Sequence, residues 1–268
     1  MNNILGFIGC GNMGGALARA AARQVDGDRI YLANRTVSKA NDLARELGAV
    51  ASSNWEIAAK ADLIFLGVKP QMMQDMLADI APILATRNDH FVLVNFAAGL
   101  SMAEIQAMAG GAYPVIRMMP NTPVAVGEGV ILYDHTKNVE RRDLDLFCDA
   151  MADAGLVDQL PEHLLDAASC LSGCGPAFAD LFLESLADGA VACGLPRAKA
   201  YKYGAQMLLG TAKLVLKTGE HPGVLKDAVC SPGGTTIAGV QALEQRSFRA
   251  AGMEAVEAAF YKTKGIGK

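Results

Sequence analysis

The sequence has little of what marks a membrane, secreted, metal-binding or nucleic-acid-binding protein. Its strongest apolar run, residues 63–68, is far shorter than the roughly 20 residues that span a bilayer, and residues 1–8 lack the basic start of a signal peptide. The six cysteines, at positions 10, 148, 170, 174, 193 and 230, show no Cys-x-x-Cys pair and no Cys/His ligand spacing. The net charge is −4, without a long basic run. We therefore expect a cytoplasmic protein with reduced thiols, no metal, no membrane contact and no nucleic-acid partner.

Charge is also scarce relative to apolar residues. Hydrophobic residues make up 51% of the chain and charged residues 19%, a balance that excludes a disordered protein because it provides enough apolar surface for a core. The 268 residues are sufficient for one large domain or for two.

Residues 4–33 have the pattern of a strand, a glycine turn, a helix and a second strand. The apolar run 4–8 leads directly into Gly-Cys-Gly-Asn-Met-Gly at 9–14, a periodic Ala/Leu segment follows, and a second apolar run covers 29–33. Gly9 would permit a tight turn, Gly11 the approach of a pyrophosphate, and Gly14 close packing of helix and strand. The phosphates would bind free N–H groups at the helix N-terminus. This context predicts a dinucleotide site and gives Cys10 no role beyond its small size.

The end of the second strand favours NADPH over NADH. NAD sites usually have a carboxylate there, but this strand ends in Asn34-Arg35-Thr36, with Lys39 one turn further on. These two cations would bind a 2′-phosphate. Asp26 and Asp28 precede the strand and so lie at the wrong edge of the sheet. We expect NADPH as the cofactor, with NADH as the alternative.

Further apolar runs predict more strands in the first half, at 63–68, 91–96, 115–118 and 130–133. Helical stretches separate the earlier runs, so the sheet should be at least partly parallel and doubly wound, in a Rossmann-like α/β domain. Ligands in such sheets bind beyond the carboxyl ends of the strands. That rule adds residues after each strand to the predicted cofactor site, which comprises Gly9, Gly11, Asn12, Met13, Gly14, Asn34, Arg35, Thr36, Asn54, Val68, Lys69, Pro70, Ala97, Gly99 and Asn121. For Asn54 the alternative is a helix N-cap, and for residues 120–123 it is a structural loop without a ligand-binding role.

The second half is predicted to be all-helical. Strand-like alternation stops near Pro161, which places domains at 1–160 and 161–268. The segment 177–193 is apolar nearly all round, with Asp180, Glu184 and Asp188 in one narrow stripe. Such a helix must be buried, either within the domain or against a second subunit.

Residues 231–236, Ser-Pro-Gly-Gly-Thr-Thr, stand before a helix expected to begin near Ile237. Exposed N–H groups at a helix N-terminus suit a carboxylate, although a structural turn or cap is the alternative. The four histidines, at 90, 135, 163 and 221, lie outside the glycine segments; we interpret them as surface or loop residues and keep only His221, ten residues before Ser231, as a minor catalytic candidate.

Taken together, these segments resemble the pyrroline-5-carboxylate reductase family. The resemblance follows the chain in order through residues 9–14, 34–36, 68–71, 119–123, 172–176 and 231–237, and the last is the most specific. It implies an N-terminal dinucleotide-binding domain and an all-α C-terminal dimerisation domain, with assembly into a decamer in some members. It also implies the reduction of a cyclic imine to L-proline, the last step of proline biosynthesis.

The resemblance also implies site residues in the second half. The substrate carboxylate would be bound by Ser231 and the backbone of Gly233, Gly234, Thr235 and Thr236, and the Thr236 hydroxyl would lie near the ring nitrogen as the catalytic residue. The family often has a serine where this chain has Cys174, so no hydroxyl role is expected there.

The chemistry is consistent with these residues. Hydride transfer needs an electrophilic carbon beside the nicotinamide, and an imine can arrive already protonated, so no strong acid is required. Alignment of the two reactants can contribute roughly 7–11 kcal/mol.

Two alternatives remain open. A β-hydroxyacid dehydrogenase would be expected to have a catalytic lysine after the interdomain glycine segment, and no lysine lies between Ala167 and Arg197. A regulator that only senses NADP(H) would leave residues 231–236 without a purpose.

Overall fold

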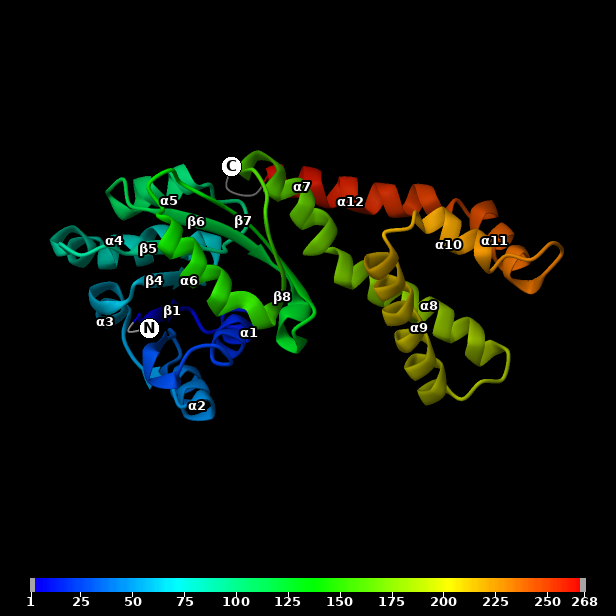
Figure 1. The fold of residues 1–268 in the computed structure, drawn as a ribbon, viewed down its shortest axis with the longest axis horizontal. Helices are drawn as coiled ribbons and strands as arrows, with labels where there is room; N and C mark the ends of the chain where they lie inside the picture. The colour runs from blue at the N-terminus through cyan, green and yellow to red at the C-terminus, as the bar shows by residue number, and fades with distance from the viewer. Residues whose placement is uncertain (1–2, 266–268) are drawn as a thin grey trace. The chain divides into compact units, whose positions relative to one another are not determined.

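In the computed structural model, residues 3–265 are described, and they form two compact units (Figure 1). The first unit comprises Met1–Cys174 together with Ala259–Lys268, and the second is Gly175–Ala258. The domain boundary expected near residue 160 remains a prediction. The break between the two compact units falls after helix α7 (Glu162–Ser172).

The first unit is built on one eight-stranded sheet with the strand order β3-β2-β1-β4-β5-β6-β7-β8. All neighbouring strands run parallel except β6 and β7, which are antiparallel. The expected partly parallel, doubly wound sheet is therefore confirmed. The strands are β1 (Leu5–Ile8), β2 (Ile30–Ala33), β3 (Val50–Ala51), β4 (Leu63–Leu66), β5 (Val92–Asn95), β6 (Val115–Pro120), β7 (Gly129–His135) and β8 (Gly155–Gln159).

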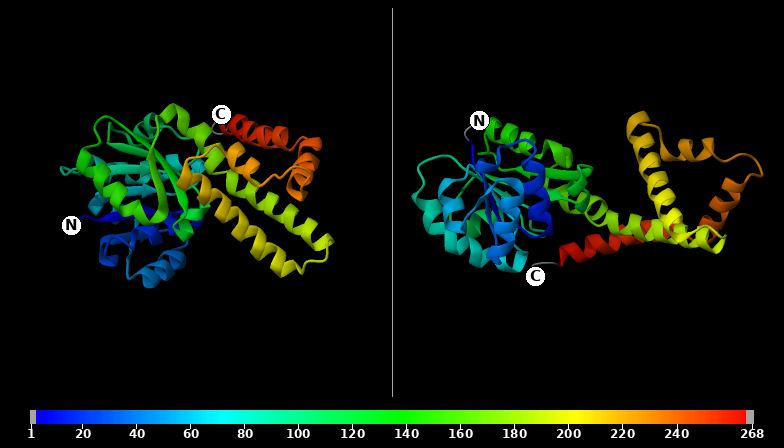
Figure 2. Two further views of the ribbon diagram at one scale, coloured as in Figure 1. Left: turned by 45° about the vertical axis from the view of Figure 1, so that its right-hand side comes forward. Right: turned by 90° about the horizontal axis from the view of Figure 1, so that it is seen from below.

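Helices cover both faces of this sheet, as the turned views in Figure 2 also show. One face packs against α1 (Asn12–Ala21), α2 (Val37–Leu47) and α6 (Arg141–Met151), and the other against α3 (Asn54–Lys60), α4 (Pro70–Thr86) and α5 (Met102–Ala109). Strand residues alternate between the two cores: Leu63 and Phe65 belong to the first, Ile64 and Leu66 to the second. Burial on both faces explains why these strands read as continuous apolar runs.

Three short 3₁₀ helices complete the first unit, η1 (Gly27–Arg29), η2 (Thr122–Val126) and η3 (Ala152–Ala154). The sequence reasoning did not name β3, whose two residues are too few for a periodic pattern, or β8. It also predicted a shorter β7, at 130–133. The strand is one residue longer at its start and two at its end, because Gly129, Asp134 and His135 also pair with neighbouring strands.

The second unit is entirely helical in the residues described, 175–258. Its helices are α8 (Gly175–Ala192), α9 (Arg197–Thr218), α10 (Pro222–Ala228), α11 (Thr235–Gln245) and α12 (Phe248–Lys264), the last of which ends in the first unit. Helices α8 and α9 pack against each other, as the left view of Figure 2 shows. Only Ala187 and Ala200 of this unit are buried. Of the two alternatives for the 177–193 helix, burial within its own domain is excluded, and burial against a second subunit stays a prediction.

Candidate active site

The glycine turn is formed as the sequence predicts. Gly9 follows β1 with φ +103°, a conformation that favours glycine, and its N–H donates to the carbonyl of Ala33 at 2.8 Å. A Cβ on Gly14 would lie 2.1 Å from the carbonyl oxygen of Gly9, whereas a Cβ on Gly11 would meet open space. The turn therefore needs Gly14 for packing, and Gly11 leaves the backbone open to a ligand.

Helix α1 offers free N–H groups at this turn. Its N-cap is Gly11, which has no side chain to cap the first turn, and no acidic residue lies in that turn. The first four N–H groups of a helix have no partner within it, and the helix dipole adds positive potential. This end of α1 can bind a phosphate.

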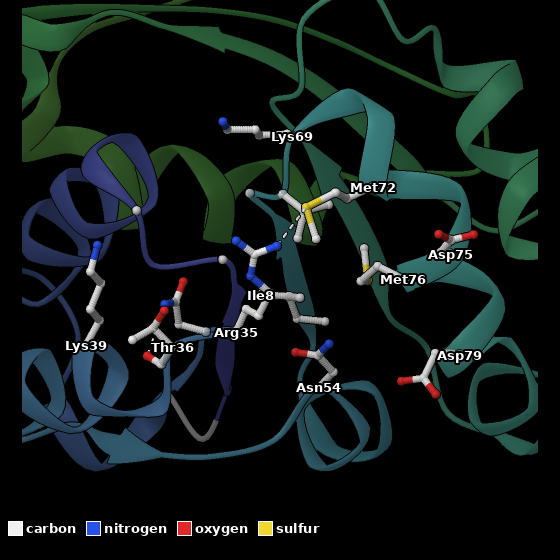
Figure 3. Close-up of a pocket in the computed structure, with 15 residues that line it drawn as sticks. Ile8, Arg35, Thr36, Lys39, Asn54, Lys69, Met72, Asp75, Met76 and Asp79 are labelled. Atoms are coloured by element: carbon white, nitrogen blue, oxygen red, sulfur yellow. Dashed lines mark hydrogen bonds between the residues drawn. The ribbon is translucent and has the colours of Figure 1, made fainter.

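A cavity of about 690 Å³ lies at this edge of the sheet (Figure 3). Eight of the predicted cofactor residues line it, namely Gly9, Gly11, Asn34, Arg35, Thr36, Asn54, Val68 and Lys69. They come from the ends of β1, β2 and β4 and from the start of α3. These segments are far apart in sequence, and the sheet order brings them together. The carboxyl ends of neighbouring parallel strands meet here, as expected for this class of sheet.

Arg35 and Lys39 supply positive charge on one side of the cavity (Figure 3). The Arg35 guanidinium makes a weak contact through Nη1 with Met72 Sδ at 3.8 Å, and among residues 3–265 it pairs with no carboxylate. Asp28 precedes β2 within η1, at the other end of the strand. The two cations are thus available to an anionic ligand.

Asn54 is a cavity residue rather than a helix cap. Ser53 occupies the N-cap of α3, and its Oγ accepts a hydrogen bond from Glu56 N at 3.1 Å. Asn54 follows as the first helical residue and lines the cavity beside Arg35 (Figure 3). The alternative interpretation as an N-cap is wrong.

The remaining predicted cofactor residues do not line this cavity: Asn12, Met13, Gly14, Pro70, Ala97, Gly99 and Asn121. Asn121 is buried, its Nδ2 donates to the Ser172 carbonyl at 2.9 Å, and its Oδ1 accepts from Val130 N at 2.8 Å. The Asn121 amide therefore links the β6–β7 connection to the end of α7, which is a structural role. A cofactor role for the seven residues stays a prediction.

Sequence reasoning missed the α4 wall of the cavity, formed by Met72, Asp75, Met76 and Asp79. Their spacing of three, four and seven residues places them along one face of the helix. That spacing, directly after the predicted Lys69-Pro70 site, was the available signal.

In the second unit, residues 231–234 form a compact turn ahead of α11. Gly233 has φ +67°, and the N–H of Gly234 donates to the Ser231 carbonyl at 3.0 Å. A Cβ on Gly234 would lie 2.3 Å from Ser231 Oγ, so any larger residue there would displace the Ser231 hydroxyl. Helix α11 begins at Thr235, two residues before the expected start, which puts Thr236 in its first turn.

This turn presents polar groups to the surface of its unit. Ser231, Gly233, Thr235 and Thr236 are exposed, and Gly234, the N-cap, makes no side-chain cap to α11. Free N–H groups beside hydroxyls suit a carboxylate. The substrate-binding role of this turn and the roles of its residues stay predictions.

Other reactive side chains have structural explanations. His221 caps α10, because its Nδ1 accepts from Gly223 N at 3.0 Å. Burial raises the pKa of the Cys10 thiol to about 11, so at neutral pH it is an inert, protonated side chain. All six cysteines are free thiols. Among residues 3–265, no cluster of metal-ligating side chains occurs, and no helix is long and apolar enough to cross a membrane.

Comparison with family models matches two parts of the chain. Residues 162–266 match the model described as pyrroline-5-carboxylate reductase dimerisation, and residues 4–99 match NADP oxidoreductase coenzyme F420-dependent. The first covers the helical second half, and the second covers the strands and loops that form the cavity.

Individual relatives match from end to end. The chain is 39% identical to the pyrroline-5-carboxylate reductase of Escherichia coli over the full length of both, and 40% identical to that of Synechocystis over 98% of each. The solved pyrroline carboxylate reductase of Plasmodium falciparum, with NADP bound, has a TM-score of 0.87 and 34% identity over 100% of this chain and 99% of its own. That of Coxiella burnetii has a TM-score of 0.90 and 29% identity over all of both chains. This similarity over the full length of the chain shows that it belongs to the pyrroline-5-carboxylate reductase family.

Proposed function

We propose that this enzyme reduces 1-pyrroline-5-carboxylate to L-proline by hydride transfer from NADPH, the last step of proline biosynthesis. The observation that carries the proposal is the cavity at the end of β1, β2 and β4, where Arg35 and Lys39 occupy the place in which NAD sites have a carboxylate. The choice of substrate is supported by the full-length similarity to relatives named pyrroline-5-carboxylate reductase.

The cavity suits NADPH by its chemistry. The pyrophosphate would bind the N-terminal N–H groups of α1 beside Gly11, and the 2′-phosphate would bind Arg35 and Lys39. NADH lacks that phosphate, so it would serve as the weaker alternative. NADPH, when bound, supplies the hydride.

The turn at 231–236 would hold the substrate. Ser231 Oγ and the N–H groups at the start of α11 are hydrogen-bond donors, which a carboxylate needs. The Thr236 hydroxyl, in the same helical turn, would orient the ring nitrogen. This assigns the carboxylate to Ser231 and the backbone of Gly233, Gly234, Thr235 and Thr236, and the imine nitrogen to the Thr236 hydroxyl.

The reaction needs little acid–base help from the protein. A protonated imine already carries the positive charge that hydride addition removes: the hydride forms the new C–H bond, and the C=N π electrons become the amine lone pair. The chain's residues therefore act by holding two reactants in line, an effect of roughly 7–11 kcal/mol in favourable cases.

The proposal includes a homodimer, with further assembly into a decamer as the larger form. Its support is the second unit, which buries only Ala187 and Ala200 by itself and matches a dimerisation model. It also places the enzyme in the cytoplasm, since the six free thiols are what a reducing compartment maintains.

The test is NADPH absorbance decay with pyrroline-5-carboxylate, run beside NADH, with proline quantified. 1-Pyrroline, the same ring without the carboxylate, is the matched substrate. We expect proline equal to the NADPH consumed, slower turnover with NADH, and at least a tenfold lower kcat/KM for 1-pyrroline, because each tenfold corresponds to about 1.4 kcal/mol of lost carboxylate contacts. No turnover by protein that binds NADPH would instead favour the sensing regulator.

A further inference from the structure

The cavity is electrically asymmetric. Arg35 and Lys39, from the end of β2 and the start of α2, lie on one side, and Asp75 and Asp79, from α4, lie on the other, with Asn54 between the two groups (Figure 3). A 2′-phosphate is therefore attracted to the first side and repelled from the second. The adjoining base must then face α4.

The chemistry of the α4 side suits a purine. Met72 and Met76 present thioether side chains, and Ile8 adds an aliphatic one, so the space between the charged groups has apolar walls for a flat ring. Ionised carboxylates accept hydrogen bonds and cannot donate any. Adenine offers a donor to them through its exocyclic amino group, whereas a 6-oxo purine such as hypoxanthine presents a carbonyl oxygen there.

Asp79 is the carboxylate held in place. Its Oδ2 accepts a hydrogen bond from Trp55 Nε1 at 2.8 Å, which fixes the side chain and leaves Oδ1 to accept from a ligand. Figure 3 shows the Asp79 carboxylate turned toward Asn54. Trp55 is the next residue after Asn54 in α3, so one helix both lines the cavity and orients its acceptor.

We propose that Asp79, positioned by Trp55, accepts a hydrogen bond from the amino group of the cofactor's adenine and makes the enzyme select an adenine dinucleotide over its 6-oxo analogue. The inference rests on the proposed use of NADPH and adds the element that recognises the base.

The test compares dissociation constants by isothermal titration calorimetry, without substrate, for NADPH and for its deamino analogue, in which hypoxanthine replaces adenine. The wild-type enzyme should bind NADPH about fivefold more tightly, a typical effect of one exposed hydrogen bond to a charged group. Asp79→Asn should bring the ratio close to one, because an amide can donate to the 6-oxo group. Asp75→Asn, the matched control one helical turn away, should keep the wild-type ratio.

Trp55→Phe tests the positioning role. It keeps an aromatic ring but removes the Nε1 donor, so the preference should fall to about twofold while Asp79 itself remains. A purely structural role for Trp55 would weaken both dinucleotides equally and leave the ratio unchanged.

The outcomes separate the two proposals. Wild-type protein that binds neither dinucleotide contradicts the proposed function and, with it, this inference. Wild-type protein that binds both equally, or an Asp79→Asn variant that keeps the full preference, overturns the inference alone. Loss of the preference in Asp75→Asn but not in Asp79→Asn would also overturn it.

Discussion

The two units of this chain differ in how they handle apolar surface. The first unit buries its large side chains on both faces of the sheet, with Phe7, Phe65 and Phe147 almost fully enclosed. The second buries only two alanines, and its helices leave Leu181, Leu209 and Leu216 at least half exposed. Apolar surface of this extent is expected to be covered by another subunit. The first unit thus folds around its own core, and the second is built to be completed by a partner.

The strongest way to break this comparison is to place a charge on each unit. Leu181→Glu on α8 should convert the dimer to a monomer and lower turnover more than a hundredfold, because an interface would have to bury an unpaired carboxylate at a cost of several kcal/mol. Sedimentation velocity gives the mass. Leu156→Glu on β8 is the control and should change neither mass nor turnover. Leu156 is 57% exposed and Leu181 is 67% exposed, so the two positions are comparable. If the two variants have the same mass and the same turnover, the two units do not differ in their need for a partner subunit.

A methyl group tests how tightly the first unit is packed at its glycine turn. Gly14→Ala should lower the free energy of unfolding by about 3 kcal/mol or prevent folding, since the added Cβ would overlap the Gly9 carbonyl. Gly11→Ala meets open space and should leave the melting temperature unchanged while weakening NADPH binding about tenfold. Thermal unfolding and calorimetry together measure both. If Gly11→Ala binds NADPH normally, the pyrophosphate does not approach this backbone.

Thr236 tests whether the second unit does chemistry as well as assembly. Thr236→Ala should reduce kcat about thirtyfold, a loss of roughly 2 kcal/mol, with the NADPH dissociation constant unchanged because the cavity is in the first unit. Thr236→Ser keeps the hydroxyl and should recover most of the rate. Steady-state kinetics at saturating NADPH measure this, and wild-type kcat in Thr236→Ala would take the residue out of the site.

Arg35 sharpens the assignment of the cofactor to the first unit. Arg35→Ala should raise the KM for NADPH about tenfold and change that for NADH little, since only NADPH has the phosphate that the guanidinium would bind. Arg45→Ala, on the exposed side of the same α2 helix, is the control and should affect neither. Equal effects of Arg35→Ala on both cofactors would falsify the 2′-phosphate assignment.

The smallest effect concerns the thiols of the two units. Cys10, whose pKa burial raises to about 11, should resist iodoacetamide at pH 8 because the thiolate is the reactive form, whereas the exposed Cys193 should be modified within the same period. Mass spectrometry of peptides locates the label, and unfolded protein provides the fully labelled control. Because burial raises the pKa of Cys10 in the folded state, the neutral thiol stabilises the fold below about pH 9, and this contribution is lost as the pH rises through about 11. Rapid labelling of Cys10 at pH 8 would show that the turn opens.

Most of the first unit could be predicted from the sequence because its signals are local. The run at 4–8, the glycines at 9–14 and the absence of a carboxylate after β2 are all contiguous patterns with one structural meaning, and the structure places Arg35 and Asn54 at the cavity they predicted. The strand β3 was not predicted because two residues have no period. The amide of Asn121 is hydrogen-bonded to Ser172 and Val130, and its expected cofactor role stays a prediction.

The α4 wall could not be predicted in the same way. Met72, Asp75, Met76 and Asp79 look like an ordinary amphipathic helix until the sheet order places α4 beside the end of β2, across β1 and β4. Likewise, the bond between Trp55 and Asp79 joins residues 24 apart, and no spacing rule connects them.

The sequence by itself determined the fold class, the glycine turn, the cationic end of β2 and the family of this chain, because each depends on residues that are neighbours in sequence or on motifs in a fixed order. Only the tertiary structure decided which side chains share the cavity, which amides are already occupied, and that the helix at 175–192 is exposed in its own unit. The physical reason is that hydrogen bonds and burial depend on distance in space, and chain order constrains that distance only within a helix turn or along a strand.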